Sequence, residues 1–264
     1  MIRELTDYFR FGWQLVTGWR VKHERWIADL RREDILPHIK NQGALITLDL
    51  ASGRLRPQYR ILRMQNHRVY GIDLVNCPKH TWQDYAYTIA RWLYVRGLGS
   101  THLKLDDTLI CGDVSILPLR DYSVDLVTSV AAFEHFLDVP AVIRETRRVL
   151  RPGGILWILV HLFSSPSGGH NVSLSQVPLR NIPRGIDPWD HLRNRRLPFH
   201  VPLNEWRRDE YLEEFGKHFE VLKHYCAMRE GEHLLTQAIE QELSNYGRDE
   251  LTCGSYVIVG KKLH

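Results

Sequence analysis

LDLASGRL, residues Leu48–Leu55, is the stretch that decides between fold classes for this 264-residue chain. It begins as a run of apolar residues with an acid, Asp49, inside it, and it continues into a turn with one glycine, Gly53. Many α/β proteins carry a glycine-rich, ligand-binding turn directly after the first strand. The stretch fits either such a turn, with side chains in the glycine positions, or an ordinary strand end, and the remaining sequence distinguishes the two.

Four further strand-like runs follow, and segments with helical periodicity separate them. Buried strands that alternate with helices are typical of a parallel sheet covered by helices on both faces. We therefore predict an α/β fold of the doubly wound type, in which residues 41–264 form the main domain. The predicted strands are 44–51, 69–75, 107–114, 123–133 and 154–163, and the helices between them are 56–68, 80–98 and 139–154.

The two ends of the chain and one internal segment depart from this alternation. Residues 1–40 predict two helices that form an N-terminal helical cap. Residues 164–203 show no clear period, and we expect a lid and substrate wall there because long loops in compact domains are usually functional. The pattern then predicts a helix over 204–219, a strand over 220–228, a helix over 232–246 and a last strand over 254–262.

The composition is that of a soluble globular protein, with 44% hydrophobic and 25% charged residues. A formal net charge of +4 is compatible with an anionic substrate or a membrane surface, but it is low for a nucleic-acid partner. The longest apolar run, Ile155–Phe163, is too short to span a bilayer as a helix. We therefore expect a cytoplasmic protein without a transmembrane segment.

The four cysteines are Cys77, Cys111, Cys226 and Cys253, and they form no CxxC pair. Two of them lie inside apolar strand-like runs, so we expect buried thiols rather than disulfides or zinc ligands. The chain also contains no HExxH motif and no Cys/His cluster at ligand spacing. The spacing of these residues therefore predicts no metal site.

Acidic residues follow two of the predicted strands, at the edge of the sheet where doubly wound folds bind ligands. Asp73 ends the second strand, 24 residues after Asp49, and its carboxylate could accept hydrogen bonds from both hydroxyls of a ribose. Asp113, after Gly112, follows the third strand and could accept a hydrogen bond from an adenine amine. The order predicts an adenosine ligand, although both acids could simply cap helices at strand ends.

The turn itself separates two kinds of adenosine-containing cofactor. A nicotinamide dinucleotide requires a G-x-G-x-x-G turn, because its pyrophosphate needs close approach of the backbone and a helix N-terminus. The segment ASGRLR, residues 51–56, does not supply that pattern. It could still serve a ligand that has no phosphate and whose tail is an amino acid.

Four segments in this order resemble the class I S-adenosylmethionine-dependent methyltransferases, and their small-molecule, methyltransferase type 11-like branch in particular. They are LDLASGRL, VYGIDLV, CGDVSILPLRDYSVDLVTSVAAFEHFLD and RETRRVLRPGGILWI, within residues 44–163. The resemblance continues more loosely into the last predicted strand. It implies a Rossmann-like, mostly parallel seven-stranded sheet with a reversed last strand, and S-adenosyl-L-methionine as the cofactor.

The resemblance also implies the cofactor-binding residues. Those after the first strand would line the methionine end, those after the second and third would hold the ribose and adenine, and those after the fourth would pass beneath the sulfonium. Taken in that order they are Asp49, Ala51, Ser52 and Gly53; Asp73 and Leu74; Gly112, Asp113 and Val114; and Val130 and Ala131, with His135 nearby.

The chain departs from the family pattern at Ala51 and Leu55, where the family prefers glycine. Alanine costs little at a negative φ, and Leu55 could turn outward, whereas a positive φ at either position would be strained. We interpret the turn as functional because the acids downstream, Asp73 and Asp113, are both present.

The expected activity is methyl transfer to an oxygen, or a nitrogen, of a small molecule or glycan-type metabolite. A hydroxyl acceptor would need a base, for which His170, His161 and His135 are the candidates in falling order, with His191 also in the predicted lid. An anionic group on the substrate could bind Arg184, Arg193, Arg195 and Arg196, although a solvated basic loop is the simpler interpretation.

Three other functions remain open at this stage. A non-catalytic binding protein could keep the fold while Ala51 and Leu55 weaken its affinity for the cofactor. An RNA methyltransferase would use the arginines and aromatic residues of the predicted lid for phosphate contacts and stacking. A nicotinamide-dependent oxidoreductase lacks its phosphate-binding turn here, and the sequence does not indicate an oligomeric state.

Overall fold

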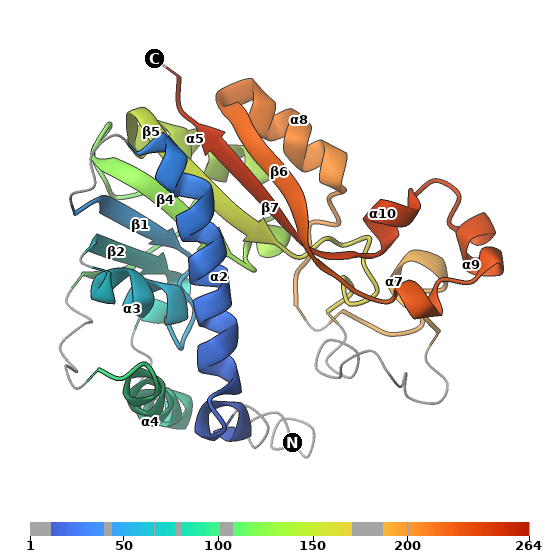
Figure 1. The fold of residues 1–264 in the computed structure, drawn as a ribbon, viewed down its shortest axis with the longest axis horizontal. Coiled ribbons are helices and arrows are strands. Elements are labelled where there is room, and N and C mark those ends of the chain that lie inside the picture. Colours follow the sequence, from blue (N-terminus) through green and yellow to red (C-terminus); the bar gives the residue numbers. More distant parts are fainter. Residues whose placement is uncertain are drawn as a thin grey trace. The chain divides into compact units, whose positions relative to one another are not determined.

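The structure, a computed structural model, describes residues 12–39, 44–65, 67–77, 81–100, 108–170, 187–199 and 201–263. Within these residues, seven strands form one sheet in the order β3-β2-β1-β4-β5-β7-β6 (Figure 1). The strands are β1 Ile46–Leu50, β2 Arg68–Asp73, β3 Leu109–Cys111, β4 Val124–Val130, β5 Leu150–Val160, β6 Glu220–Arg229 and β7 Cys253–Lys261.

Strand directions confirm the predicted α/β class. β1 pairs with β2, and β2 with β3, in parallel, whereas β6 and β7 run antiparallel. The predicted doubly wound, mostly parallel sheet with a reversed last strand is therefore correct. The α-helices are α2 Trp19–Ile35, α3 Pro57–Met64, α4 Trp82–Gly97, α5 Val139–Val149, α7 Asp190–Arg193, α8 Arg208–His218, α9 Gln237–Glu242 and α10 Arg248–Leu251. The 3-10 helices are η1 Leu36–His38, η2 Leu74–Asn76, η3 Phe133–His135 and η4 Glu232–Leu234.

The chain divides into two compact units. The first comprises residues 1–128 and 148–155, and the second comprises residues 129–147 and 156–264. Among the described residues, no helix is long and apolar enough to cross a membrane.

In the first unit, α2 packs against α3 and α4 over an apolar cluster that includes Val21, Leu55 and Tyr94 (Figure 1). Leu55 is 5% exposed, so the expectation that it turns outward is wrong. Its side chain fills the space between the helices, and burying a leucine contributes roughly 1.5–3 kcal/mol to folding. A glycine at this position would leave that space empty.

The same unit also buries a polar network. Gln58 of α3 donates from Nε2 to the Glu24 carboxylate at 2.7 Å and accepts at Oε1 from the Arg31 guanidinium at 2.8 Å. Glu24 and Arg31 lie on α2 and are buried, and Arg20 pairs with Glu24 at 2.7 Å. Because buried charges are costly unless they are paired, this network fixes the position of α2 on α3.

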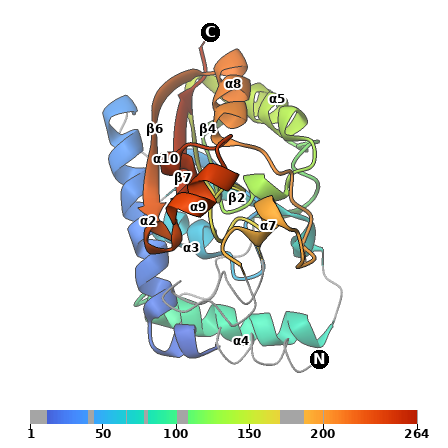
Figure 2. The same cartoon turned by 90° about the vertical axis from the view of Figure 1, so that its right-hand side faces the viewer.

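In the second unit, β6 and β7 form a long antiparallel pair, and α8 packs along both strands (Figure 2). A separate apolar cluster joins Trp189 to α9 and α10. The indole Nε1 of Trp189 donates to the carbonyls of Ser164 and Leu251, both at 3.1 Å. The described part of the predicted lid is thus anchored by a buried tryptophan, while residues 171–186 lie outside the described residues.

Element boundaries differ from prediction where short strands or turns have weak signals. β3 is only three residues long, and β5 begins at Leu150 rather than at residue 154. The strand passes through Pro152 and Gly153, with φ +77° at Gly153, where the sequence predicted the end of the helix over 139–154. The helix predicted over 232–246 divides into η4 and α9.

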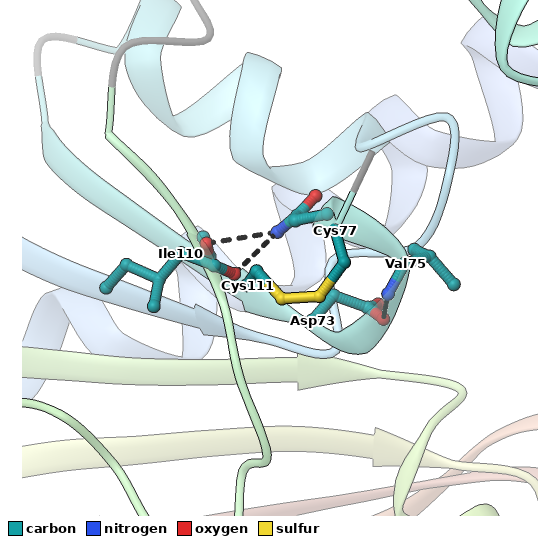
Figure 3. The surroundings of a disulfide bond; sticks show 7 residues. Asp73, Val75, Cys77, Ile110 and Cys111 are labelled. Atoms are coloured by element: carbon teal, nitrogen blue, oxygen red, sulfur yellow. Dashed lines mark hydrogen bonds between the residues drawn. A yellow bond between two sulfur atoms is a disulfide. The ribbon is translucent and has the colours of Figure 1, made fainter. Parts of the chain in front are cut away.

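Cys77 and Cys111 form a disulfide, which corrects the expectation that all four cysteines are thiols (Figure 3). Parallel pairing of β2 with β3 places their carboxyl ends together, so the two Cα atoms lie 4.9 Å apart although 34 residues separate them in sequence. Spacing along the chain could not reveal this proximity. Cys226 and Cys253 remain free thiols, the first half-buried and the second buried.

We predict that Cys111→Ser lowers the free energy of unfolding by about 3–4 kcal/mol, because the disulfide closes a 34-residue loop in the unfolded chain. Chemical denaturation of the wild type with and without reductant should give the same difference. Reductant added to Cys111→Ser should cause no further loss. An unchanged denaturation midpoint in the variant would contradict the prediction.

Candidate functional site

The turn after β1 contains two residues in the left-handed region of backbone conformation. Ala51 has φ +51° and Gly53 has φ +68°. An alanine in this region costs roughly 1 kcal/mol relative to glycine because its Cβ crowds the following carbonyl. Ser52 between them is buried, and its N–H faces the carbonyl of Ile72 at 3.4 Å. The strain foreseen for a positive φ is therefore present at Ala51.

The Asp73 carboxylate joins the ends of the first two strands. Its Oδ2 accepts the backbone N–H of Gly53 at 2.8 Å, and its Oδ1 accepts that of Val75 at 2.9 Å. The second bond caps η2, so the helix-capping role considered for Asp73 is real. Leu74, the next residue, exposes 62% of its surface. This strand end thus presents a carboxylate, a glycine turn and an exposed apolar side chain together.

Asp113 lies in an exposed turn after β3. Its Oδ1 accepts hydrogen bonds from the N–H and the hydroxyl of Ser115, both at 2.8 Å. These bonds hold the pKa of the carboxyl below its usual range. At the preceding Gly112, an added Cβ would lie 3.2 Å from Cδ1 of Ile72, so there is little room for a side chain. Val114, the other predicted residue here, is half-buried.

A pocket of about 180 Å³ lies in the same unit. Val75 and Asn76, which follow Asp73, line one side, and residues of α4 line the other. Its arginines already have partners, since Arg54 pairs with Asp84 at 3.0 Å and Arg91 donates to the Arg54 carbonyl at 3.0 Å. The pocket therefore borders the Asp73 turn but does not include Asp73 itself.

Asp49 is buried within β1 rather than open to the turn. Burial raises its pKa to about 7, while Arg31 of α2 opposes the shift and Glu24 and Asp73 add to it. Asp49 thus interacts electrostatically with the buried network on α2. Its predicted place at the methionine end of a cofactor remains a prediction.

The remaining predicted residues lie in the second unit. Val130 ends β4, and Ala131 follows it with φ +51°, its N–H bonded to the carbonyl of Leu159 at 2.8 Å. Like Ala51, Ala131 is a non-glycine residue held in the left-handed region directly after a strand. Such strained positions gather at functional sites.

Three histidines named as candidate bases come together in the second unit. The ring centroids of His135 and His170 lie 4.8 Å apart, and those of His161 and His170 lie 6.0 Å apart. They approach from η3, from the end of β5 and from the turn after it, so only folding unites them. Burial lowers the pKa of His170 to about 3, and the neighbouring histidines add to this effect.

Glu134, which was not among the predicted site residues, lies within this cluster. It is 2% exposed, and neither carboxylate oxygen has a hydrogen-bond partner. His170 Nε2 is 3.9 Å from Glu134 Oε1. Burial raises the pKa of Glu134, while His161, His135 and the backbone N–H groups of Glu134 and His161 oppose that shift. The sequence signal that could have identified Glu134 is its position next to His135, shortly after the predicted fourth strand.

Asn204 holds Glu134 and His135 in place, and the sequence did not single it out. Its side-chain N–H₂ donates to the carbonyls of Phe133 and Phe136, at 2.7 and 3.0 Å, and its backbone N–H donates to that of Glu134 at 2.9 Å. Tyr211 donates in turn to Asn204 Oδ1 at 3.0 Å. One asparagine therefore closes both ends of η3.

Other residues of the predicted lid have structural partners. His191 is buried with Nε2 2.7 Å from the carbonyl of Phe163, and burial lowers its pKa to about 4. Arg184 lies outside the described residues. The other three arginines each pair with a carboxylate, as the simpler interpretation of a basic loop allows. The pairs are Arg193 with Glu242, Arg195 with Glu205 and Arg196 with Asp187.

Comparison with known proteins finds a match to a methyltransferase domain in part of the chain. Residues 48–158 match the family model for a methyltransferase domain. A sterol 24-C-methyltransferase of Gibberella zeae is 26% identical over 172 residues, covering 61% of this chain and 41% of that protein. A malonyl-(acyl-carrier protein) O-methyltransferase of Coxiella burnetii is 38% identical over 69 residues, 24% of each chain. The chain thus spans less than half the length of these curated relatives.

A solved structure shares the fold. The geranyl diphosphate C-methyltransferase of Streptomyces coelicolor A3(2), in complex with Mg²⁺, geranyl diphosphate and S-adenosyl-L-homocysteine, aligns with a TM-score of 0.52 at 15% identity. The alignment covers 89% of this chain and 77% of that one. At this identity the likeness establishes the fold alone.

We predict that Ala51→Gly raises the free energy of unfolding by about 1 kcal/mol, because it relieves the positive φ. Gly53→Ala is the matched control and should lower it by a similar amount. No heavy atom lies within 4 Å of an added Cβ at Gly53, so the loss there reports the backbone alone. Chemical denaturation measures the free energy of unfolding of both variants. A lower value for Ala51→Gly than for the wild type would show that the backbone at Ala51 is not strained.

We predict that Asp49 makes stability fall as the pH rises. Its folded pKa of about 7 lies above the unfolded value of 3.8, so the folded state holds the extra proton between these limits. The penalty is absent below about pH 4 and complete above about pH 7. Asp49→Asn should remove the part of this pH dependence that is due to Asp49. Urea unfolding of wild type and variant across this pH range measures the difference in their free energies of unfolding. If the free energies of unfolding of wild type and variant change with pH in the same way, the prediction is wrong.

Proposed function

We propose that this chain, whose residues 48–158 are a domain of the methyltransferase family, transfers a methyl group from S-adenosyl-L-methionine to a small-molecule or glycan-type acceptor. The acceptor atom is an oxygen or a nitrogen. The observation that carries the proposal is the strand end at Asp73, where a carboxylate, a left-handed glycine and an exposed leucine lie together. The bound S-adenosyl-L-homocysteine of the structural neighbour supports the choice of cofactor.

The residues at this strand end fit an adenosine ligand. The Asp73 carboxylate presents the acceptor atoms that a ribose diol requires, and its bond to Gly53 holds the turn in place. Gly53 leaves open space where a side chain would stand. Leu74 offers an exposed apolar surface for packing against a purine ring, and Asp113 offers a second carboxylate at the next strand end.

The protein's part in such a reaction is alignment and the exclusion of water. S-adenosyl-L-methionine supplies, when bound, a methyl group on a sulfonium that is already a good leaving group. Asp73 would fix the ribose, and the backbone of Ala51–Gly53 would lie along the methionine end. Holding the acceptor in line accounts for most of the barrier reduction expected in such reactions.

The acceptor atom is inferred from the histidine cluster. A hydroxyl is a poor nucleophile until its proton is removed, so a base near it accelerates attack. His170, His161 and His135 provide imidazole nitrogens within one cluster, beside the buried Glu134. Glu134 and His135 follow Ala131 by three and four residues, and the family resemblance assigns Ala131 to the sulfonium end.

The class of acceptor is inferred from the relatives. The names of these proteins refer to a sterol, an acyl-carrier-bound malonyl group and geranyl diphosphate, all small-molecule groups. These proteins differ in the atom that they methylate, so the comparison does not indicate the acceptor atom for this chain. Because the described lid arginines are paired with carboxylates, an anionic group on the acceptor is not part of the proposal.

We predict that the purified protein binds S-adenosyl-L-homocysteine and that Asp73→Asn weakens binding at least ~10-fold, because a hydrogen bond to a charged group contributes roughly 1.5–3 kcal/mol. Calorimetric titration measures both affinities. Asp29→Asn is the control, since Asp29 is an exposed acid of α2 that pairs only loosely with Arg32 at 3.7 Å.

The outcomes separate the alternatives. If wild type and Asp29→Asn bind equally and Asp73→Asn does not, the adenosine site is established. If none of the three folded proteins binds, the strain at Ala51 has abolished cofactor affinity and a non-catalytic binding protein is the better description. Binding of NADH in place of the homocysteine analogue would favour an oxidoreductase.

A further inference from the structure

We propose that Glu134, His135 and His170, with His161 as a fourth donor, bind one divalent transition-metal ion. One donor atom of each of the first three lies within 4.8 Å of the others. All four residues belong to the second unit, so the proposal does not depend on how the two units are arranged.

The strongest observation is the unpartnered carboxylate of Glu134. It is 2% exposed, and no well-formed hydrogen bond reaches either oxygen, since the nearby backbone N–H groups of Glu134 and His161 only partly offset its burial. A buried carboxylate without a partner is costly, and native proteins pair such groups or use them as ligands. The nearest imidazole nitrogen, His170 Nε2, stands 3.9 Å away, too far for a hydrogen bond.

The distance between Glu134 Oε1 and His170 Nε2 does suit two atoms that bind the same metal ion. Donors at about 2.1 Å from a metal are separated by about 3.0 Å when they are at right angles and by about 4.2 Å when they are opposite. The spacing of 3.9 Å between Glu134 and His170 lies inside this range. The wider limit of 4.8 Å for the donor atoms of Glu134, His135 and His170 requires only a small inward movement of side chains.

Two histidines are oriented as metal ligands usually are. His135 Nδ1 lies 2.9 Å from the carbonyl oxygen of Pro202, and His161 Nδ1 lies 3.0 Å from that of Gly254. A carbonyl oxygen only accepts, so Nδ1 must carry the proton and Nε2 keeps its lone pair. Donation of the second ring N–H to a carbonyl is the usual outer-shell support of a histidine ligand.

The backbone also holds these ligands in place. Asn204 fixes η3 through the carbonyls of Phe133, Glu134 and Phe136. His170 has φ +47°, a left-handed conformation that is uncommon for residues other than glycine. Its N–H donates to the carbonyl of Ser167 at 2.9 Å. The donors are thus held by independent contacts before any ion arrives.

The donor set indicates which ions fit. Imidazole nitrogens with one carboxylate suit Mn²⁺, Fe²⁺, Co²⁺ and Zn²⁺, whereas Mg²⁺ and Ca²⁺ prefer oxygen ligands. Such an ion would make a coordinated acceptor hydroxyl more acidic, with its proton released to water and the electron pair kept on oxygen. This catalytic use rests on the proposed function, but metal binding does not.

The test is titration of the tag-free, chelator-treated and dialysed protein with Mn²⁺, Co²⁺ and Zn²⁺ separately, with Mg²⁺ for comparison. Calorimetry should give one site per chain for at least one of the three transition ions. Glu134→Gln and His170→Asn should each weaken binding by at least ~100-fold, since even outer-shell changes cost 10–100-fold. Asparagine is chosen at residue 170 because it tolerates a positive φ.

His218→Gln is the matched control and should bind like the wild type. His218 and Glu214 form another histidine–glutamate pair in the same unit, with Nε2 3.5 Å from Oε1. Circular dichroism checks that each variant is folded, and the half-exposed His135→Gln provides the measurement if a buried substitution unfolds the protein.

Absence of binding by the wild type for all three transition ions would overturn the proposal. Equal affinity in the wild type and the folded cluster variants would also overturn it, because the ion would then bind elsewhere. Titration of the same metal-free sample with S-adenosyl-L-homocysteine is a separate readout. Loss of that binding alone would reject the proposed function and leave the metal site standing.

Discussion

The Asp73 carboxylate is the contact on which the first unit's candidate site depends. It accepts N–H groups from Gly53, in the turn after β1, and from Val75, at the start of η2. Two strand ends and the residues after them are therefore fixed by one side chain. The disulfide between Cys77 and Cys111 ties the same strand end to β3. These three adjacent ends supply every predicted cofactor residue of this unit.

Three of the described non-glycine residues with positive φ belong to the candidate sites. Ala51 and Ala131 both take φ +51° directly after β1 and β4, and His170 takes φ +47° in the turn after β5. Each costs roughly 1 kcal/mol that glycine would save, and such a cost persists only where the surroundings fix the backbone. The positions coincide with residues assigned to a cofactor or a reacting group. The chain therefore retains local strain at Ala51, where the methyltransferases that it resembles prefer glycine, and at His170 of the proposed metal site.

The second unit contributes a different kind of constraint, a buried carboxylate without a partner. Glu134 lies with His135 and His170, and Asn204 closes its segment. A group of this kind destabilises the folded chain unless a proton or a cation neutralises it. Such a cost is commonly retained where chemistry needs it. Under the proposed function, the strand end at Asp73 would bind the adenosine and this cluster would supply the groups that an acceptor needs.

The sequence by itself determined the class of fold, because strand-like runs and amphipathic helices alternate with a clear period and Asp73 and Asp113 follow their strands. It could not determine contacts between segments that are distant along the chain. Leu55 packs into a core built from three helices. Cys77 lies beside Cys111 because β2 and β3 pair in parallel. Glu134, which follows β4, lies beside His170, which follows β5. Periodicity is a local property that each segment carries alone. Proximity between such segments is created by packing, so only the tertiary structure decided these contacts.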